Sequence, residues 1–141
     1  MPRLMSVALT AQAVVERRKT VTRRLGWTFL KPGDRLTLCR KVQGRRRRDG
    51  TVEPLVRLAE VEVLSVRRER LINITAPEVR KEGFGHWIDE LGRHGARVKF
   101  LDFFCNAMHV GRATFVTRIE WRYLDGEVSQ SVSATQRDPA A

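Results

Sequence analysis

The sequence has little cysteine and no long apolar run, which excludes several classes of protein at once. Cys39 and Cys105 are too few for a disulfide framework or a zinc cage, and both lie in apolar stretches, so we expect buried free thiols. No apolar run approaches the roughly 18 residues of a membrane-spanning helix. The first residues lack an apolar stretch with a small-residue cleavage site. We therefore expect a cytoplasmic protein with no membrane partner.

Motifs typical of several enzyme classes are also missing. The sequence has no glycine-rich phosphate loop, no helical histidine pair with a glutamate, and no Gly-x-Ser-x-Gly elbow. His86, His94 and His109 are not spaced as metal ligands, and the aromatic signature of RNA-recognition sheets is absent. We therefore expect neither a metal ion nor a cofactor.

Positive charge is abundant, and it is concentrated in one part of the 141-residue chain. The net charge is +11; residues 1–57 carry 15 Lys and Arg against 4 Asp and Glu, whereas residues 58–141 carry 12 of each. A one-sided excess suits a polyanionic partner. Biased arginine usage would give the same excess, because the chain has 22 arginines and 5 lysines. The run from Arg45 to Arg48 before Asp49-Gly50 predicts a basic turn, either a solvated hairpin loop or a set of phosphate contacts.

The order of apolar patterns predicts β-α-β-β-β-α-α-β and hence an α+β domain. Successive strands argue against a doubly wound sheet and favour a small barrel of mixed or antiparallel strands, with helices closing one side. We expect one domain over residues 1–124 and a polar, flexible tail at 125–141. The expected strands are Leu4–Leu9, Lys19–Leu25, Arg35–Val42, Val56–Val66 and Ala113–Tyr123, the last with alternating apolar and polar residues. The expected helices are Ala11–Arg18 with Thr10 as cap, a helix from the capping box Thr75-Ala76-Pro77-Glu78 to Lys81 or Glu82, Trp87–Leu91, and a buried helix over Val98–Val110.

One segment gathers the side chains that chemistry would need. Residues 16–24, Glu-Arg-Arg-Lys-Thr-Val-Thr-Arg-Arg, contain five cations and two hydroxyls directly after a predicted short helix. In an extended chain Lys19 and Thr22 face opposite sides, but a twist or bulge at the strand start would bring them together. The alternative is a basic edge strand whose charges prevent aggregation.

Four pieces of sequence, in order, resemble the ASCH domain family, relatives of the PUA-like RNA-binding barrels. They are Arg17 to Arg24, similar to the family's Gly-Arg-Lys-Thr-x-Thr-x-Arg signature; the Pro-Gly-Asp turn at 32–34; the strand 61–71 leading through Ile74-Thr75 to a helix that ends in Glu82-Gly83-Phe84; and the final strand 115–120. Together they span about residues 5–124, and the chain looks like the small phage and prophage members. It departs from the family pattern at Arg17, where the family has glycine, and at Arg40-Lys41, where it has Arg-Glu.

The resemblance implies a cleft between sheet and helices, lined by the Lys-Thr segment. In the branch of the family that hydrolyses acetylated cytidine, the proposed catalytic set maps onto Lys19, Thr22 and Glu82. A lysine with a depressed pKa could take the proton of the threonine hydroxyl, and the glutamate could hold the lysine or pass a proton to the leaving amine.

The leading functional hypothesis is a nucleic-acid-binding module with a basic cleft and RNA as its expected partner. Its candidate contacts are Arg18, Lys19, Arg23, Arg24, Arg40, Arg45, Arg46, Arg47 and Arg48, with Trp27 as a possible stacking platform. The alternatives are an amidohydrolase acting on acetylated cytidine or a similar modified nucleoside, a ribonuclease, and a basic protein that binds an acidic partner protein. The sequence leaves open whether the protein is an enzyme.

Overall fold

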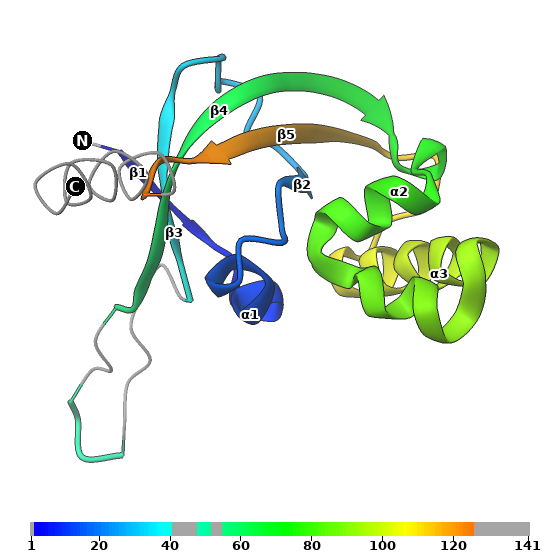
Figure 1. Ribbon diagram of the computed structural model, residues 1–141, viewed down its shortest axis with the longest axis horizontal. Helices are drawn as coiled ribbons and strands as arrows, with labels where there is room; N and C mark the ends of the chain where they lie inside the picture. Colours follow the sequence, from blue (N-terminus) through cyan, green and yellow to red (C-terminus); the bar gives the residue numbers. More distant parts are fainter. Residues whose placement is uncertain (1, 41–47, 52–54, 126–141) are drawn as a thin grey trace, which may run out of the picture.

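The protein folds as one five-stranded sheet with helices inserted between the strands (Figure 1). The computed structural model describes residues 2–40, 48–51 and 55–125. The strands are β1 (Arg3–Ser6), β2 (Val21–Arg24), β3 (Arg35–Cys39), β4 (Arg57–Arg70) and β5 (Phe115–Tyr123). The helices are α1 (Ala11–Val15), α2 (Ala76–Val79) and α3 (Gly85–Met108), with short turns η1 (Ala8–Thr10), η2 (Leu71–Asn73) and the π-helical η3 (Arg80–Phe84). The predicted order of strands and helices is confirmed.

The sheet is mixed and strongly curved. Its strand order is β1-β3-β4-β5-β2, with β1 parallel to β3 and the other pairs antiparallel. The long strands β4 and β5 arch over α1, while α2 and α3 lie together at one end of the arch (Figure 1). β1 and β2 are the two edges of this half-barrel. The predicted α+β class, with a small curled sheet of mixed strands and helices on one side, is confirmed.

Two separate apolar cores hold the molecule together. The core inside the half-barrel contains Met5, Val7, Val14, Leu30, Leu36, Leu38, Val61, Val63, Ile119 and Trp121. The core among the helices contains Leu71, Ile74, Val79, Phe84, Trp87, Ala96, Phe100, Leu101, Phe104 and Val116. β5 supplies residues to both, because its alternating side chains enter one core from each face. The predicted polar face of β5 is therefore partly wrong: Arg118 is only 5% exposed, since helices cover this face.

The predicted capping box starts its helix at the expected place but does not form its hydrogen bonds. α2 begins at Ala76 with Pro77 in its first turn, and the side chain of Thr75 makes no capping hydrogen bond. Glu78 turns instead toward the sheet, where Arg23 and Arg118 donate to its carboxylate. Thr10 likewise precedes α1 without a capping hydrogen bond. Stronger, charged donors have taken the carboxylate that a capping box would use.

The remaining expectations are met to different degrees. α3 runs from Gly85 to Met108, and a break at Gly92 divides it into the two helical pieces that the sequence indicates. Cys39 is buried as expected, whereas Cys105 is only half-buried. The predicted basic loop lies mostly outside the described residues, which include only its end, a turn at residues 48–50. The predicted tail is also outside them, apart from Asp125.

Gly83, in η3, lies where this segment packs closely against α1. Its φ of +104° lies in the region that favours glycine, and an added Cβ would meet the Ala13 Cβ at 3.0 Å. We expect Gly83→Ala to lower the free energy of unfolding by about 2 kcal/mol, through backbone strain plus overpacking. Chemical denaturation measures this change.

Gly111→Ala is the matched control, because nothing lies within 4 Å of its Cβ position. It should change stability by less than about 0.5 kcal/mol. Equal stability of the two variants would contradict the role given to Gly83.

Candidate active site

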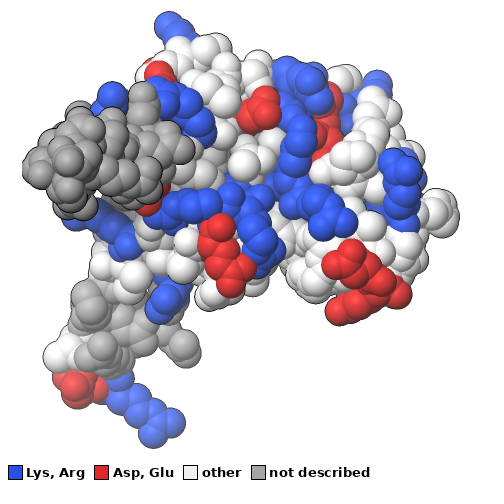
Figure 2. Space-filling view, viewed as in Figure 1, with Lys and Arg blue, Asp and Glu red and all other residues white. Residues whose placement is uncertain are grey.

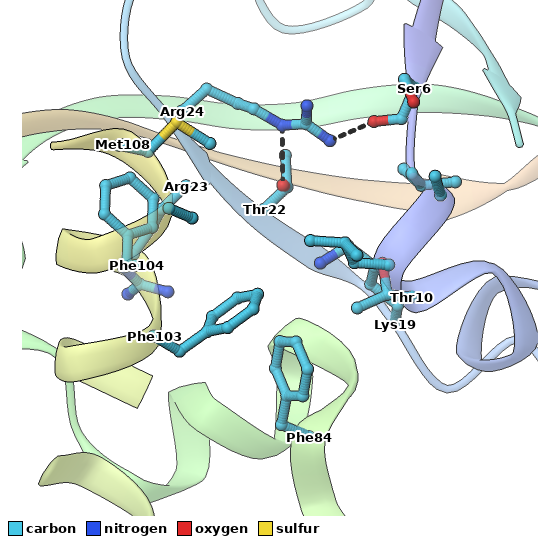
Figure 3. A pocket seen from close by; sticks show the side chains of 14 residues that line it. Ser6, Thr10, Lys19, Thr22, Arg23, Arg24, Phe84, Phe103, Phe104 and Met108 are labelled. Carbon is cyan, nitrogen blue, oxygen red and sulfur yellow. Dashed lines mark hydrogen bonds between the residues drawn. The ribbon is translucent and has the colours of Figure 1, made fainter. Parts of the chain in front are cut away.

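A pocket of about 200 Å³ opens where the two cores face each other. One wall comes from the half-barrel: the end of β1 with η1, and the start of β2. The other wall comes from η3 and α3 (Figure 3). The lining residues are Ser6, Val7, Ala8, Leu9, Thr10, Lys19, Thr22, Arg23, Arg24, Phe84, Phe103, Phe104, Ala107 and Met108. The pocket thus has a polar wall on β2 and an aromatic wall on the helices.

Lys19 is a buried amine in the polar wall. It is 3% exposed, and its Nζ donates to the backbone oxygen of Glu82 at 2.6 Å and to Oε1 of the same residue at 3.2 Å. Burial lowers the pKa of Lys19; the Glu82 carboxylate opposes this shift, while Arg24 and Arg23 reinforce it. The amine is therefore more easily deprotonated than an exposed lysine.

The backbone of Lys19 is fixed by the aromatic end of β5. Its carbonyl oxygen accepts hydrogen bonds from Trp121 Nε1 at 3.1 Å and from the hydroxyl of Tyr123. Arg17, which stands where the family pattern has glycine, keeps a left-handed φ of 63°. Its guanidinium lies over the Tyr123 ring, 4.9 Å from the centroid, and donates to the Val14 oxygen at 2.7 Å. Arg17 therefore packs on Tyr123, the residue whose hydroxyl donates to the Lys19 carbonyl oxygen.

Thr22 and Arg24 form the second part of the polar wall (Figure 3). Both lie on the same face of β2, two residues apart. Arg24 Nε donates to Thr22 Oγ1 at 3.1 Å, and Nη2 donates to the backbone oxygen of Ser6 at 2.6 Å. One guanidinium thus positions the threonine hydroxyl and links the edge strands β1 and β2. Thr22 is 3% exposed, so its hydroxyl is shielded from bulk water.

Arg23 points to the other face of β2, where three glutamates surround it. Its Nε donates to Glu69 at 3.1 Å, Nη1 to Glu82 at 3.0 Å and Nη2 to Glu78 at 2.6 Å. Burial alone would raise the pKa of Glu78, but hydrogen bonds from Arg118 and Arg23 lower it to about 2. Glu82 is shared: Oε1 contacts Lys19 while Oε2 contacts Arg23.

The structure brings the three predicted catalytic residues together. Lys19 and Thr22 line the same pocket. Glu82, on η3, does not line it but contacts the Lys19 amine. Their catalytic role itself stays a prediction. The residues that sequence reasoning missed are the aromatic wall of Phe84, Phe103 and Phe104. The apolar pattern of residues 98–110 predicts only core, and nothing in it separates side chains that face a pocket from those that fill the interior.

The predicted nucleic-acid contacts are dispersed. Arg23 and Arg24 are held inside the protein by the hydrogen bonds above, and Trp27 packs against the half-barrel core. Arg18, Arg40 and Arg48 are exposed, while positions 45–47 lie outside the described residues. On the face in Figure 2, groups of Lys and Arg alternate with Asp and Glu. The exposed candidates Arg18, Arg40 and Arg48 therefore do not line this pocket.

The described part of the chain, residues 2–40, 48–51 and 55–125, has neither a membrane-spanning helix nor a metal-binding cluster. None of its helices is long and apolar enough to cross a membrane. No group of three His, Cys, Asp or Glu side chains in that part is arranged to hold a metal ion.

Comparisons with known proteins find solved structures of similar fold. No family model matches the sequence, and no curated protein matches it in sequence. Protein EF3133 from Enterococcus faecalis V583, described as a member of family DUF984, superimposes with a TM-score of 0.56; the match is 14% identical and covers 88% of this chain and 77% of that one. An ASCH domain from Lactobacillus crispatus JV V101 gives a TM-score of 0.48 at 12% identity, over 82% of this chain and 70% of that one. The chain therefore shares its fold with this DUF984 protein.

Proposed function

We propose that the pocket is the active site of an amidohydrolase that removes an acyl group from the amino group of a nucleobase or nucleoside. The observation that carries the proposal is the placement of a buried lysine with a lowered pKa in one pocket with a threonine hydroxyl. A shielded amine that is easily deprotonated is the kind of base that can activate a threonine. The ASCH-like resemblance, in which the same three positions are the catalytic set, adds to this support.

The proposed reaction uses the residues of the polar wall. The neutral Lys19 amine takes the proton of the Thr22 hydroxyl, whose oxygen attacks the acyl carbon. The carbon–nitrogen bond then breaks, and the leaving amine receives the proton from Lys19. Water hydrolyses the resulting Thr22 ester, with Lys19 again acting as base. Glu82 holds the Lys19 amine in place, and Arg24 stabilises negative charge that develops on the Thr22 oxygen.

The aromatic wall suits the rest of such a substrate. Phe84 stacks on Trp87 at a centroid distance of 4.2 Å and lies edge-on to Phe103 at 5.4 Å, so its ring is firmly held. Rigid aromatic rings favour a planar, uncharged group through stacking and apolar contact. The volume is below the roughly 300 Å³ at which typical ligand pockets begin, which favours a single base over an extended chain.

The direct test is hydrolysis of N-acetylcytidine by the wild type and three variants. We expect Lys19→Ala, Thr22→Ala and Glu82→Ala each to lower kcat by about 100-fold or more, because each removes a group that acts on the reacting atoms or holds one that does. Thr22→Ser keeps a hydroxyl and should retain measurable turnover. Product release is followed by chromatography.

Lys31→Ala and Thr51→Ala are matched controls, since both residues are exposed. They should leave kcat unchanged, and circular dichroism should show that every variant is folded. The proposal is wrong if the wild type hydrolyses no N-acylated base, or if folded Lys19→Ala retains the wild-type rate.

We also propose that the basic amino-terminal region binds RNA without sequence preference, on a surface separate from the pocket. The net charge of +11 arises within residues 1–57. Arg40 and Arg48, which flank positions 41–47, are exposed and available to phosphates. Phosphate contacts of this kind give affinity without base selectivity.

The salt dependence of RNA binding tests this second proposal. Replacing Arg45, Arg46, Arg47 and Arg48 by serine should reduce the slope of log K against log salt by up to about 3, at about 0.7 for each lost contact to single-stranded RNA. Replacement of the same four residues by lysine is the control, and it should preserve the slope. Fluorescence anisotropy measures both. Absence of RNA binding by the wild type at low salt would remove the proposal.

A further inference from the structure

Arg118 and Glu78 lie behind the catalytic candidates and do not line the pocket, which their partner Arg23 does reach. Arg118 on β5 binds Glu78 on α2 through two nitrogens, with Nε 2.5 Å from Oε1 and Nη2 3.1 Å from Oε2. Arg23 joins this pair to Glu82, which contacts Lys19. Arg118 is 5% exposed and Glu82 is 3% exposed. A continuous series of charge-assisted hydrogen bonds thus runs from Arg118 to the Lys19 amine.

The buried charges do not balance while Lys19 is protonated. Lys19, Arg23 and Arg118 pair with Glu69, Glu78 and Glu82, and Arg24, whose guanidinium donates to Thr22 and Ser6, adds a fourth cation. The more exposed groups at the edge of the cluster are Lys81, Arg67 and Glu120, which add one further positive charge. A surplus of positive charge in a poorly solvated region favours loss of a proton from the strongest acid among the cations, which is the lysine.

We propose that Glu78 and Arg118 are positioning residues that set how readily Lys19 gives up its proton, although neither touches the pocket. The inference rests on the proposed role of Lys19 as the base. Arg118 holds Glu78, Glu78 holds Arg23, and Arg23 fixes the Glu82 oxygen that does not contact Lys19. The charges of the same residues also act on the Lys19 amine. Glu78 is negative and Arg118 is positive, so the two residues shift the protonation of Lys19 in opposite directions. Removing the glutamate increases the positive surplus, and removing the arginine decreases it.

The test is the titration of Lys19 itself, measured without substrate. The chain has five lysines, so ¹³Cε labelling of lysine gives a simple NMR spectrum in which Lys19→Met assigns the resonance. Glu78→Gln should move the Lys19 midpoint to lower pH and Arg118→Gln should move it to higher pH, each by about 0.5 to 1 unit. Because the base must be deprotonated to act, the acid limb of the rate on N-acetylcytidine should move in the same directions.

Matched controls come from a separate ion pair, which joins β4 to β5. Glu62→Gln on β4 and Arg122→Gln on β5 remove the partners of a 2.5 Å pair away from the pocket, and should leave the Lys19 midpoint unchanged. Should Glu78→Gln fail to fold, Glu69→Gln replaces it with the same expected downward shift. Should Arg118→Gln fail to fold, the downward shift and the controls remain decisive.

The outcomes separate the inference from the proposed function. Shifts of the same sign for both variants, or no shift in folded variants, would overturn the inference whether or not the protein is an amidohydrolase. Opposite shifts in a protein that hydrolyses no acylated base would overturn the proposed function and leave the electrostatic control of Lys19 standing.

Discussion

The burial of Lys19 against Glu82 is the constraint on which the rest of the site depends. An amine that is 3% exposed loses most of its hydration, and this loss is tolerable only because a carboxylate and a backbone oxygen lie within hydrogen-bond distance. Those two acceptors belong to η3, whereas the lysine precedes β2. The contact that satisfies the lysine therefore also joins the helical unit to the half-barrel. Removing the Glu82 carboxylate would take from the buried lysine the opposite charge that it contacts, whereas Glu82 without Lys19 would keep its ion pair with Arg23.

The same constraint explains why a pocket exists at this junction. The half-barrel core and the helical core approach each other along β2 and β5, where the facing side chains are Arg23, Arg118 and their glutamates. Charged groups that must keep their partners cannot interdigitate as apolar side chains do. The two cores therefore remain separate. The remaining space is lined by Thr22 on one side and by the phenylalanines of η3 and α3 on the other.

Local patterns in the sequence predict most of the fold, because they record each element's own environment. The alternation in β5, the turn chemistry of Pro32-Gly33-Asp34 and the apolar helix near the end all appear where expected. Burial of Arg118 is not predictable in this way, because it depends on a helix that is distant in sequence and covers the polar face of β5. Glu78 shows the same limit. The capping pattern indicates only a local hydrogen-bond partner for Glu78. In the structure two charged, non-local donors, Arg23 and Arg118, bind its carboxylate instead.

The basic composition of residues 1–57 does not reveal which of their cations reach the protein surface. Lys19, Arg23 and Arg24 belong to the basic amino-terminal region, yet all three are held inside by hydrogen bonds to other parts of the chain. They act on neighbouring side chains and on the pocket, so they do not enlarge the field that a polyanion would meet at the surface. A basic segment of this kind has two distinct electrostatic roles: Arg24 and Arg23 help to lower the pKa of the Lys19 amine, and its exposed cations face solvent. The two roles are physically separable, because Lys19, Arg23 and Arg24 are held by hydrogen bonds to other parts of the chain, whereas Arg18, Arg40 and Arg48 are exposed outside the strands.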